Sequence, residues 1–186
     1  MRYLNLIRTI SNWPVYFAHK FKLTQASPAR FELRSGTRIE VPREVMHEFK
    51  EVFFDEAYLT GMPLPVPAGA DIVDIGANIG SFSVFAAARF AGSRVIAFEP
   101  DVINFKMLAQ NAALQPAGRV IPVEAAIAGA AGTLTFRRME AEGISTSGSL
   151  VRKKGQEMVV KAITLEQALD EAGIAQCALL KMDCEG

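Results

Sequence analysis

The chain has 186 residues, half of them apolar, and its acidic and basic side chains balance to a formal net charge of zero. This length and apolar content predict one globular domain with a substantial core. The balanced charge provides no electrostatic footprint for nucleic acid, so no nucleic-acid partner is expected.

Cysteine and histidine are too sparse to suggest a metal centre. Cys177 lies inside a predicted buried strand and Cys184 just past its end, while His19 and His47 are isolated. No spacing typical of metal ligands is present, so we expect no metal. A reduced cytoplasmic protein is the simplest account of the two cysteines.

Residues 1–30 are predicted to form an N-terminal amphipathic segment and a linker. Apolar side chains alternate with basic ones over residues 1–23, and Pro14 interrupts any single helix. No apolar run is long enough to span a bilayer. A basic amphipathic segment could lie on a membrane surface, but we favour packing against the domain.

Residues 31–69 are predicted to form a small N-terminal cap. The alternation over residues 31–41 is typical of a β-hairpin. Residues 44–58 have apolar side chains at helical spacing, which places Glu48 on the polar outer face of the expected helix. Proline-rich residues 61–69 then form a stiff connector.

The stretch from Asp71 to Pro100 is read as strand, glycine turn, helix and strand. The apolar run 71–75 is typical of a buried parallel strand, and 94–98 forms the next one after a helix over 81–91. This pattern is half of a doubly wound α/β unit, in which ligands bind at the carboxyl ends of the strands.

Two acidic residues lie where packing alone does not explain them. Asp74 is near the end of an apolar strand, where a carboxylate needs a hydrogen-bonding partner. Glu99 ends the next strand, at a spacing that suits a carboxylate accepting both hydroxyls of a ribose. The alternative is that Asp74 only caps the turn and Glu99 is solvated.

The glycine turn departs from the dinucleotide pattern G-x-G-x-x-G. Asn78 replaces the middle glycine and Ser81 the last one, so a pyrophosphate would be poorly bound. The pattern D-x-G-x-N-x-G instead resembles motif I of class I S-adenosylmethionine-dependent methyltransferases.

Four segments extend this resemblance over residues 31–186: VDIGANIGSFS, VIAFEPDVINFKMLAQNAAL, VEAAIAGAAGTLTF and LLKMDCEG. Their order and spacing are similar to those of the FkbM-type methyltransferases. The resemblance implies a Rossmann-like, doubly wound fold with a mostly parallel sheet, a cofactor-binding core over 70–186 and S-adenosyl-L-methionine as cofactor. It also implies methyl transfer to a hydroxyl of a sugar or secondary-metabolite type acceptor.

The resemblance implies cofactor contacts from the glycine turn and from the ends of neighbouring strands. Asn104, in the first turn of a helix over 101–114, would lie on the ribose side, and Glu124 with Ala125 would face the adenine. An ordinary strand-end loop is the alternative for that pair. The expected cofactor-binding residues are Asp74, Gly76, Ala77, Asn78, Gly80, Glu99, Pro100, Asn104, Glu124 and Ala125.

Asp183 and Glu185, which follow the predicted strand 177–182, are the candidates for chemistry. Methyl transfer is an in-line displacement, so an acceptor oxygen must be aligned behind the methyl group. A carboxylate can assist by taking the hydroxyl proton. It could equally bind the ammonium group of the cofactor. We assign Asp183 to cofactor or acceptor orientation and Glu185 to the acceptor.

The remaining residues predict an antiparallel excursion over 132–137 and 157–163, followed by a helix capped by Thr164 and Gln167. By the resemblance, further C-terminal strands are missing, so we expect weak cofactor binding, low activity and self-association through an exposed sheet edge. Two other functions stay open: a nicotinamide-dependent oxidoreductase, and a non-catalytic truncated module that acts by association.

Overall fold

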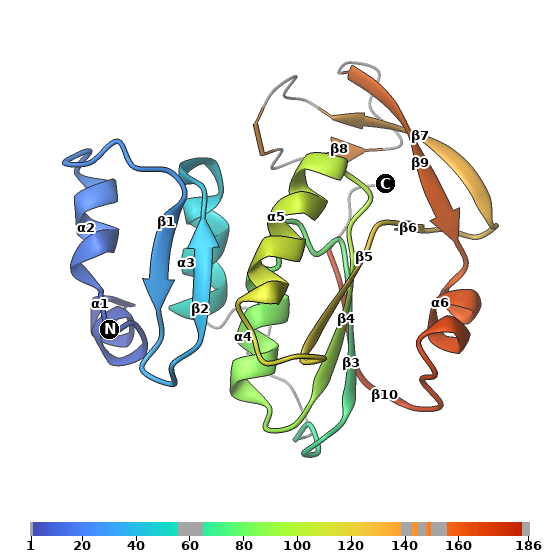
Figure 1. The fold of residues 1–186 in the computed structure, drawn as a ribbon, viewed down its shortest axis with the longest axis horizontal. Coiled ribbons are helices and arrows are strands. Elements are labelled where there is room, and N and C mark those ends of the chain that lie inside the picture. Colours follow the sequence, from blue (N-terminus) through green and yellow to red (C-terminus); the bar gives the residue numbers. More distant parts are fainter. Residues whose placement is uncertain (1, 56–64, 139–142, 145–147, 150–155, 184–186) are drawn as a thin grey trace.

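The computed structural model describes residues 2–55, 65–138, 143–144, 148–149 and 156–183 (Figure 1). Its centre is a four-stranded parallel sheet with the order β10-β3-β4-β5. The strands are β3 (Asp71–Ile75), β4 (Arg94–Phe98), β5 (Val120–Val123) and β10 (Cys177–Met182). The predicted Rossmann-like α/β fold on a mostly parallel sheet is confirmed.

Both faces of this sheet are covered, as expected for parallel strands. Helices α4 (Ser81–Arg89) and α5 (Val102–Ala113) cover one face, and α6 (Leu165–Glu171) covers the other (Figure 1). Alternate residues of each strand enter different cores. Ile72 and Val95 belong to the cluster under α4, whereas Val73 and Ile96 belong to the cluster that includes Ala168 of α6.

A second sheet has the order β6-β9-β7-β8. Its strands are β6 (Ala126–Ile127), β7 (Gly132–Arg138), β8 (Gly148–Ser149) and β9 (Gln156–Ile163). The antiparallel pair β7–β9 and the capping box of Thr164 with Gln167 confirm the predictions for this region. Strands β6 and β8 were not expected, because a two-residue strand has no periodicity to detect.

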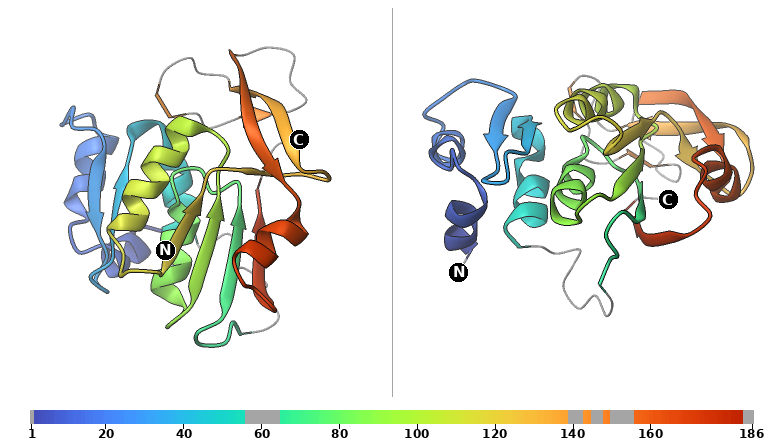
Figure 2. Two further views of the ribbon diagram at one scale, coloured as in Figure 1. Left: turned by 45° about the vertical axis from the view of Figure 1, so that its right-hand side comes forward. Right: turned by 60° about the horizontal axis from the view of Figure 1, so that its bottom comes forward.

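The N-terminal elements form successive layers beside α4 and α5 (Figure 2). They are α1 (Arg2–Thr9), α2 (Pro14–Lys20), β1 (Ala29–Glu32), β2 (Arg38–Val41), the 3₁₀ turn η1 (Arg43–Val45) and α3 (Met46–Phe53). Pro14 starts α2, where its missing N–H costs nothing. Leu6, Ile10 and Tyr16 are buried in the core, so the inward packing expected of this segment is confirmed.

Three predicted boundaries were wrong by two residues. The hairpin begins at Ala29, the helix expected to continue to residue 91 ends at Arg89, and the helix expected from residue 44 begins at Met46 after a 3₁₀ turn. The described residues exclude 56–58, which were predicted to belong to that helix. They also exclude residues 61–64 of the predicted connector. The division of the chain at residues 30 and 69 stays a prediction.

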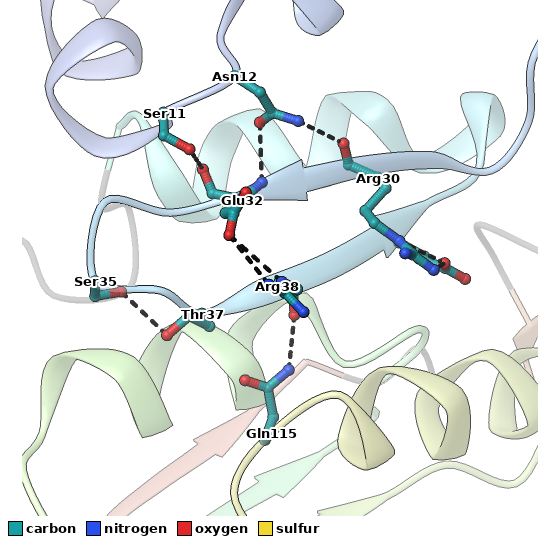
Figure 3. A network of polar contacts seen from close by, with 9 residues as sticks. Ser11, Asn12, Arg30, Glu32, Ser35, Thr37, Arg38 and Gln115 are labelled. Carbon is teal, nitrogen blue, oxygen red and sulfur yellow. Dashed lines mark hydrogen bonds and ion pairs between the residues drawn. The ribbon is translucent and has the colours of Figure 1, made fainter.

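Side-chain amides join the hairpin to the elements on either side of it. Asn12 accepts from the Glu32 N–H at 2.9 Å and donates to the Arg30 carbonyl at 2.9 Å, and Gln115 donates to the Arg38 carbonyl at 2.7 Å (Figure 3). The fully buried Asn111 of α5 donates to the carbonyls of Glu40 and Ile79 and accepts from the Glu40 N–H. These bonds fix the cap relative to the glycine turn.

Within the described residues, every helix is too short or too polar to cross a lipid bilayer.

Candidate active site

The glycine turn between β3 and α4 has the left-handed backbone that its sequence predicts. The φ angles of Gly76, Asn78 and Gly80 are 73°, 51° and 86°. A Cβ on Gly80 would lie 2.7 Å from Cδ1 of Leu108, so any other residue there requires that side chain to shift as well as a strained left-handed φ. The N–H groups of Gly76 and Ala77 both donate to the Phe98 carbonyl at 3.0 Å, which ties the turn to the end of β4.

Glu99, directly after β4, is buried at the centre of this turn. Its Oε2 accepts the N–H of Asn78 at 2.8 Å, and its Oε1 accepts the N–H of Asp101 at 2.9 Å. Burial is nevertheless the main cause that raises the pKa of Glu99 to about 7; the two hydrogen bonds oppose the rise, and the carboxylates of Asp101 and Asp74 add to it. The alternative of a solvated Glu99 is wrong, because the residue is 5% exposed.

Asp74 is fully buried, and both of its carboxylate oxygens have partners within the protein. The Ser83 hydroxyl donates to Oδ2 at 2.6 Å, and Nζ of Lys181 lies 3.1 Å from Oδ1. Asp74 therefore holds the start of α4 and the end of β10 together.

Lys181 is a site residue that the sequence analysis missed. It lies in the edge strand β10, and its side chain is only 9% exposed. Besides its ion pair with Asp74, it donates to the Gly76 carbonyl at 3.0 Å, and its Nζ lies 3.9 Å from the Asp183 carboxylate. A lysine inside the apolar run CALLKM was the available signal, since a buried cation needs a buried anion beside it.

Glu48 is the second missed residue, and its predicted place on the outer face of the cap helix was wrong. It is half-buried, and its Oε2 accepts the side-chain amide of Asn78 at 3.0 Å. Burial is the main cause that raises the pKa of Glu48 to about 7; Asp183 adds to the rise and Lys181 opposes it. The α3 helix thus contributes a carboxyl group to the glycine turn.

A buried ion pair fixes the start of α5 beside Glu99. Asp101 caps the helix by accepting from the N–H groups of Ile103 and Asn104, at 2.8 and 3.3 Å. Its other oxygen lies 2.7 Å from Nε of Arg138 on β7, and both side chains are at most 4% exposed. The second sheet therefore supports the turn that presents Glu99.

Comparison with known proteins shows the family to which the chain belongs. The model of the methyltransferase FkbM domain matches residues 74–186, which is more than half of the chain. The chain belongs to the FkbM methyltransferase family. The family is one of methyltransferases.

Three curated relatives agree with this membership of the FkbM family. The 31-O-demethyl-FK506 methyltransferase FkbM of Streptomyces tacrolimicus is 31% identical over 173 residues, covering 76% of this chain and 65% of its own length. Methyltransferase sdnD of Sordaria araneosa is 34% identical, covering 49% of this chain and 34% of its own. Methyltransferase 1 of Beauveria bassiana is 35% identical, covering 44% and 30%. The chain spans less than two thirds of the length of these relatives.

The other predicted site residues that the structure describes in this FkbM-family chain follow the ends of the core strands and differ in exposure. Asn104 is buried in the first turn of α5 and Pro100 is half-buried, whereas Glu124 is exposed and Ala125 is buried against the second core. Asp183 follows β10, donates its N–H to the Ile75 carbonyl at 3.1 Å and is 60% exposed. Glu185 lies outside the described residues. The ligand roles of all these residues stay predictions.

Proposed function

We propose that this chain is an S-adenosylmethionine-dependent O-methyltransferase that acts on a hydroxyl of a sugar or secondary-metabolite type acceptor. Membership of the FkbM family supports the methyl transfer, and the cofactor is the one that this family implies. The Streptomyces relative is named for 31-O-demethyl-FK506, which supports an oxygen atom as the acceptor.

The observation that carries the proposal is the placement of Glu99. Its two oxygens each hold one backbone N–H, so each keeps a lone pair that can accept a ribose hydroxyl. The two N–H donors also fix the orientation of the carboxylate. A carboxylate preorganised at the end of β4 suits a nucleoside, whose ribose offers two neighbouring hydroxyl donors.

The glycine turn provides groups for the amino-acid end of the cofactor. Ser81, the first residue of α4, is 5% exposed, and within the described residues its Oγ has no hydrogen-bond partner. A ligand atom beside the turn would satisfy it. Lys181 and Asp183 supply opposite charges at the same edge, which suits a zwitterion that carries both an ammonium and a carboxylate.

Bound S-adenosylmethionine would supply an electrophilic methyl group on sulfur. Within this chain, we assign to Glu48 the removal of the acceptor proton as the oxygen–carbon bond forms and the sulfur–carbon bond breaks. A carboxyl with a pKa of about 7 is divided between its two forms near neutral pH, which favours general-base catalysis. We assign acceptor orientation to Asp183, and Glu185 stays a prediction for the acceptor side.

Calorimetric titration with S-adenosylhomocysteine tests this function, with NADH as the control ligand. Saturable binding of the first ligand and none of the second is expected. Binding of NADH would instead favour an oxidoreductase, and self-association without affinity for either ligand would favour a non-catalytic module.

A further inference from the structure

The first 23 residues expose far more apolar surface than packing on the domain requires. Leu6 and Ile10 of α1 are fully buried, so this segment already has an inward face. Other large apolar side chains point outward, and Phe21 and Leu23 are 62% and 77% exposed. We call the outward set the N-terminal apolar surface: Tyr3, Leu4, Ile7, Phe21 and Leu23.

The half-buried ring of Phe17 on α2 connects two exposed members of this surface, Tyr3 of α1 and Phe21. The Tyr3 and Phe17 rings lie 5.6 Å apart, and Phe17 stacks on Phe21 at 6.1 Å. Tyr3 and Ile7 are one helical turn apart, so they lie on the same side of α1. Nζ of Lys20 lies 4.7 Å above the Tyr3 ring, which places a cation at the edge of the apolar side chains.

The charge carried by this segment of the sequence is of one sign. No Asp or Glu precedes Glu32, although the whole chain is neutral. Arg8, Lys20 and Lys22 are exposed beside the apolar side chains, and Arg34 donates to the Ile7 carbonyl at 3.1 Å.

Two acidic residues of the neighbouring hairpin, Glu32 and Glu40, are ion-paired with Arg38 and Arg30 respectively. The positive charge beside the apolar surface is therefore not neutralised by these two carboxylates. A partner with negative charge above an apolar layer would complement both features.

The exposed end of α2 is held in place by backbone hydrogen bonds. The N–H of Leu23 donates to the Ala18 carbonyl and that of Lys22 to the His19 carbonyl, which is the Schellman arrangement. Lys22 occupies the left-handed position, with φ of 57°, where glycine would be less strained. Leu23 is thus presented outward by a defined structure.

We propose that the N-terminal apolar surface binds an anionic lipid bilayer, with α1 and α2 lying in the plane of the headgroups. An apolar helix face with basic residues at its edge gains affinity for a bilayer in two ways: it buries apolar area, and it is attracted to anionic lipid. Helices α1 and α2 form the outermost layer of the molecule, beyond the hairpin and α3 (Figures 1 and 2). The inference is independent of the methyl donor and of the acceptor.

Vesicle co-sedimentation tests this proposal with the full chain. We expect the protein to sediment with vesicles of phosphatidylcholine and phosphatidylglycerol, and much less with phosphatidylcholine alone. Raising the salt from about 0.1 M to about 1 M should weaken binding, because it shortens the Debye length from about 10 Å to about 3 Å. The double variant Phe21→Ser and Leu23→Ser should lose about tenfold in partitioning or more.

Two matched controls separate this effect from general changes of the surface. Val159→Ser makes the same kind of change at a residue that is 72% exposed on β9, and it should leave partitioning unchanged. Lys22→Asn should weaken binding to anionic vesicles, while Lys106→Asn on the exposed side of α5 should not. Circular dichroism of each variant checks that the fold is kept.

Two results would overturn the proposal. One is a protein that sediments equally well with and without anionic lipid, or a double variant that sediments as well as the original chain. The other is a concentration-dependent oligomer without vesicle binding that the double variant abolishes, which would assign the surface to a second copy of the chain.

Discussion

The side-chain amide of Asn78 donates a hydrogen bond of 3.0 Å to Oε2 of Glu48. This bond joins the glycine turn to α3, two elements that are separated by about 30 residues of chain. The backbone N–H of the same asparagine donates to Glu99 at 2.8 Å. One residue therefore orients two carboxyl groups, and burial raises the pKa of each to about 7.

Replacing Asn78 with glycine tests the link to Glu48. Glycine adopts the left-handed φ of 51° without strain but removes the amide donor. Because a donor favours the charged form of a carboxyl, we expect Asn78→Gly to raise the pKa of Glu48 further. Titration of the Glu48 carboxyl followed by carbon NMR measures this. An unchanged pKa would show that the bond does not act on Glu48 in solution.

The pH dependence of stability should reveal the same carboxyl. The pKa of Glu48 is raised from 4.5 to about 7, so its contribution to stability is present below pH 4.5 and is lost as pH rises through about 7. Denaturant unfolding of the original chain should show this loss, about 1–3 kcal/mol for the group. Glu48→Gln should reduce the slope between these values, whereas Glu44→Gln on the exposed side of η1 should not. Equal slopes in Glu48→Gln and the original chain would contradict the assignment.

The ion pair of Lys181 with Asp74 should matter for stability. Lys181→Met removes the cation and leaves the fully buried carboxylate with only Ser83, so we expect a loss of about 3–5 kcal/mol. Lys161→Met on exposed β9 should change the free energy of unfolding by less than about 0.5 kcal/mol. Adding Asp74→Asn to Lys181→Met should recover part of the loss, and a double variant as unstable as the sum of the two single ones would contradict the pairing.

Two glycines allow a matched test of the close approach at Gly80. Gly36 and Gly80 have almost the same φ, 87° and 86°, but only at Gly80 would a Cβ meet another atom, Cδ1 of Leu108. Gly36→Ala should therefore cost only the backbone strain, about 1–2 kcal/mol. Gly80→Ala should cost about 1–3 kcal/mol more because of the overpacking. Thermal unfolding measures both, and equal losses would show that the Leu108 contact yields freely.

The core sheet could be predicted because its signals are local. Buried parallel strands are short apolar runs, and the glycines and the asparagine after β3 indicate a turn. Asp101 and Thr164 likewise indicate where the helices that they cap begin. The prediction that Asp74 and Glu99 lie at one sheet edge followed from the doubly wound pattern alone.

The missed site residues depend on contacts that no local pattern encodes. Glu48 was placed on an outer face by helical periodicity, but the glycine turn lies beside it and Asn78 contacts its carboxylate. Lys181 was overlooked because a strand at the sheet edge was expected to be apolar. For both residues, tertiary contacts determine whether the side chain belongs to the site. The sequence offers only one signal for them, a charge that needs a partner when it is buried.

The most direct test of the account is the affinity of the chain for S-adenosylhomocysteine with and without the Glu99 carboxylate. We expect calorimetry to show binding of one ligand per chain, and Glu99→Gln to weaken it about tenfold or more, since a hydrogen bond to a charged group is worth about 1.5–3 kcal/mol. Glu166→Gln, on exposed α6, should bind as the original chain does. Equal affinity of Glu99→Gln and the original chain, or no binding by either, would contradict the account.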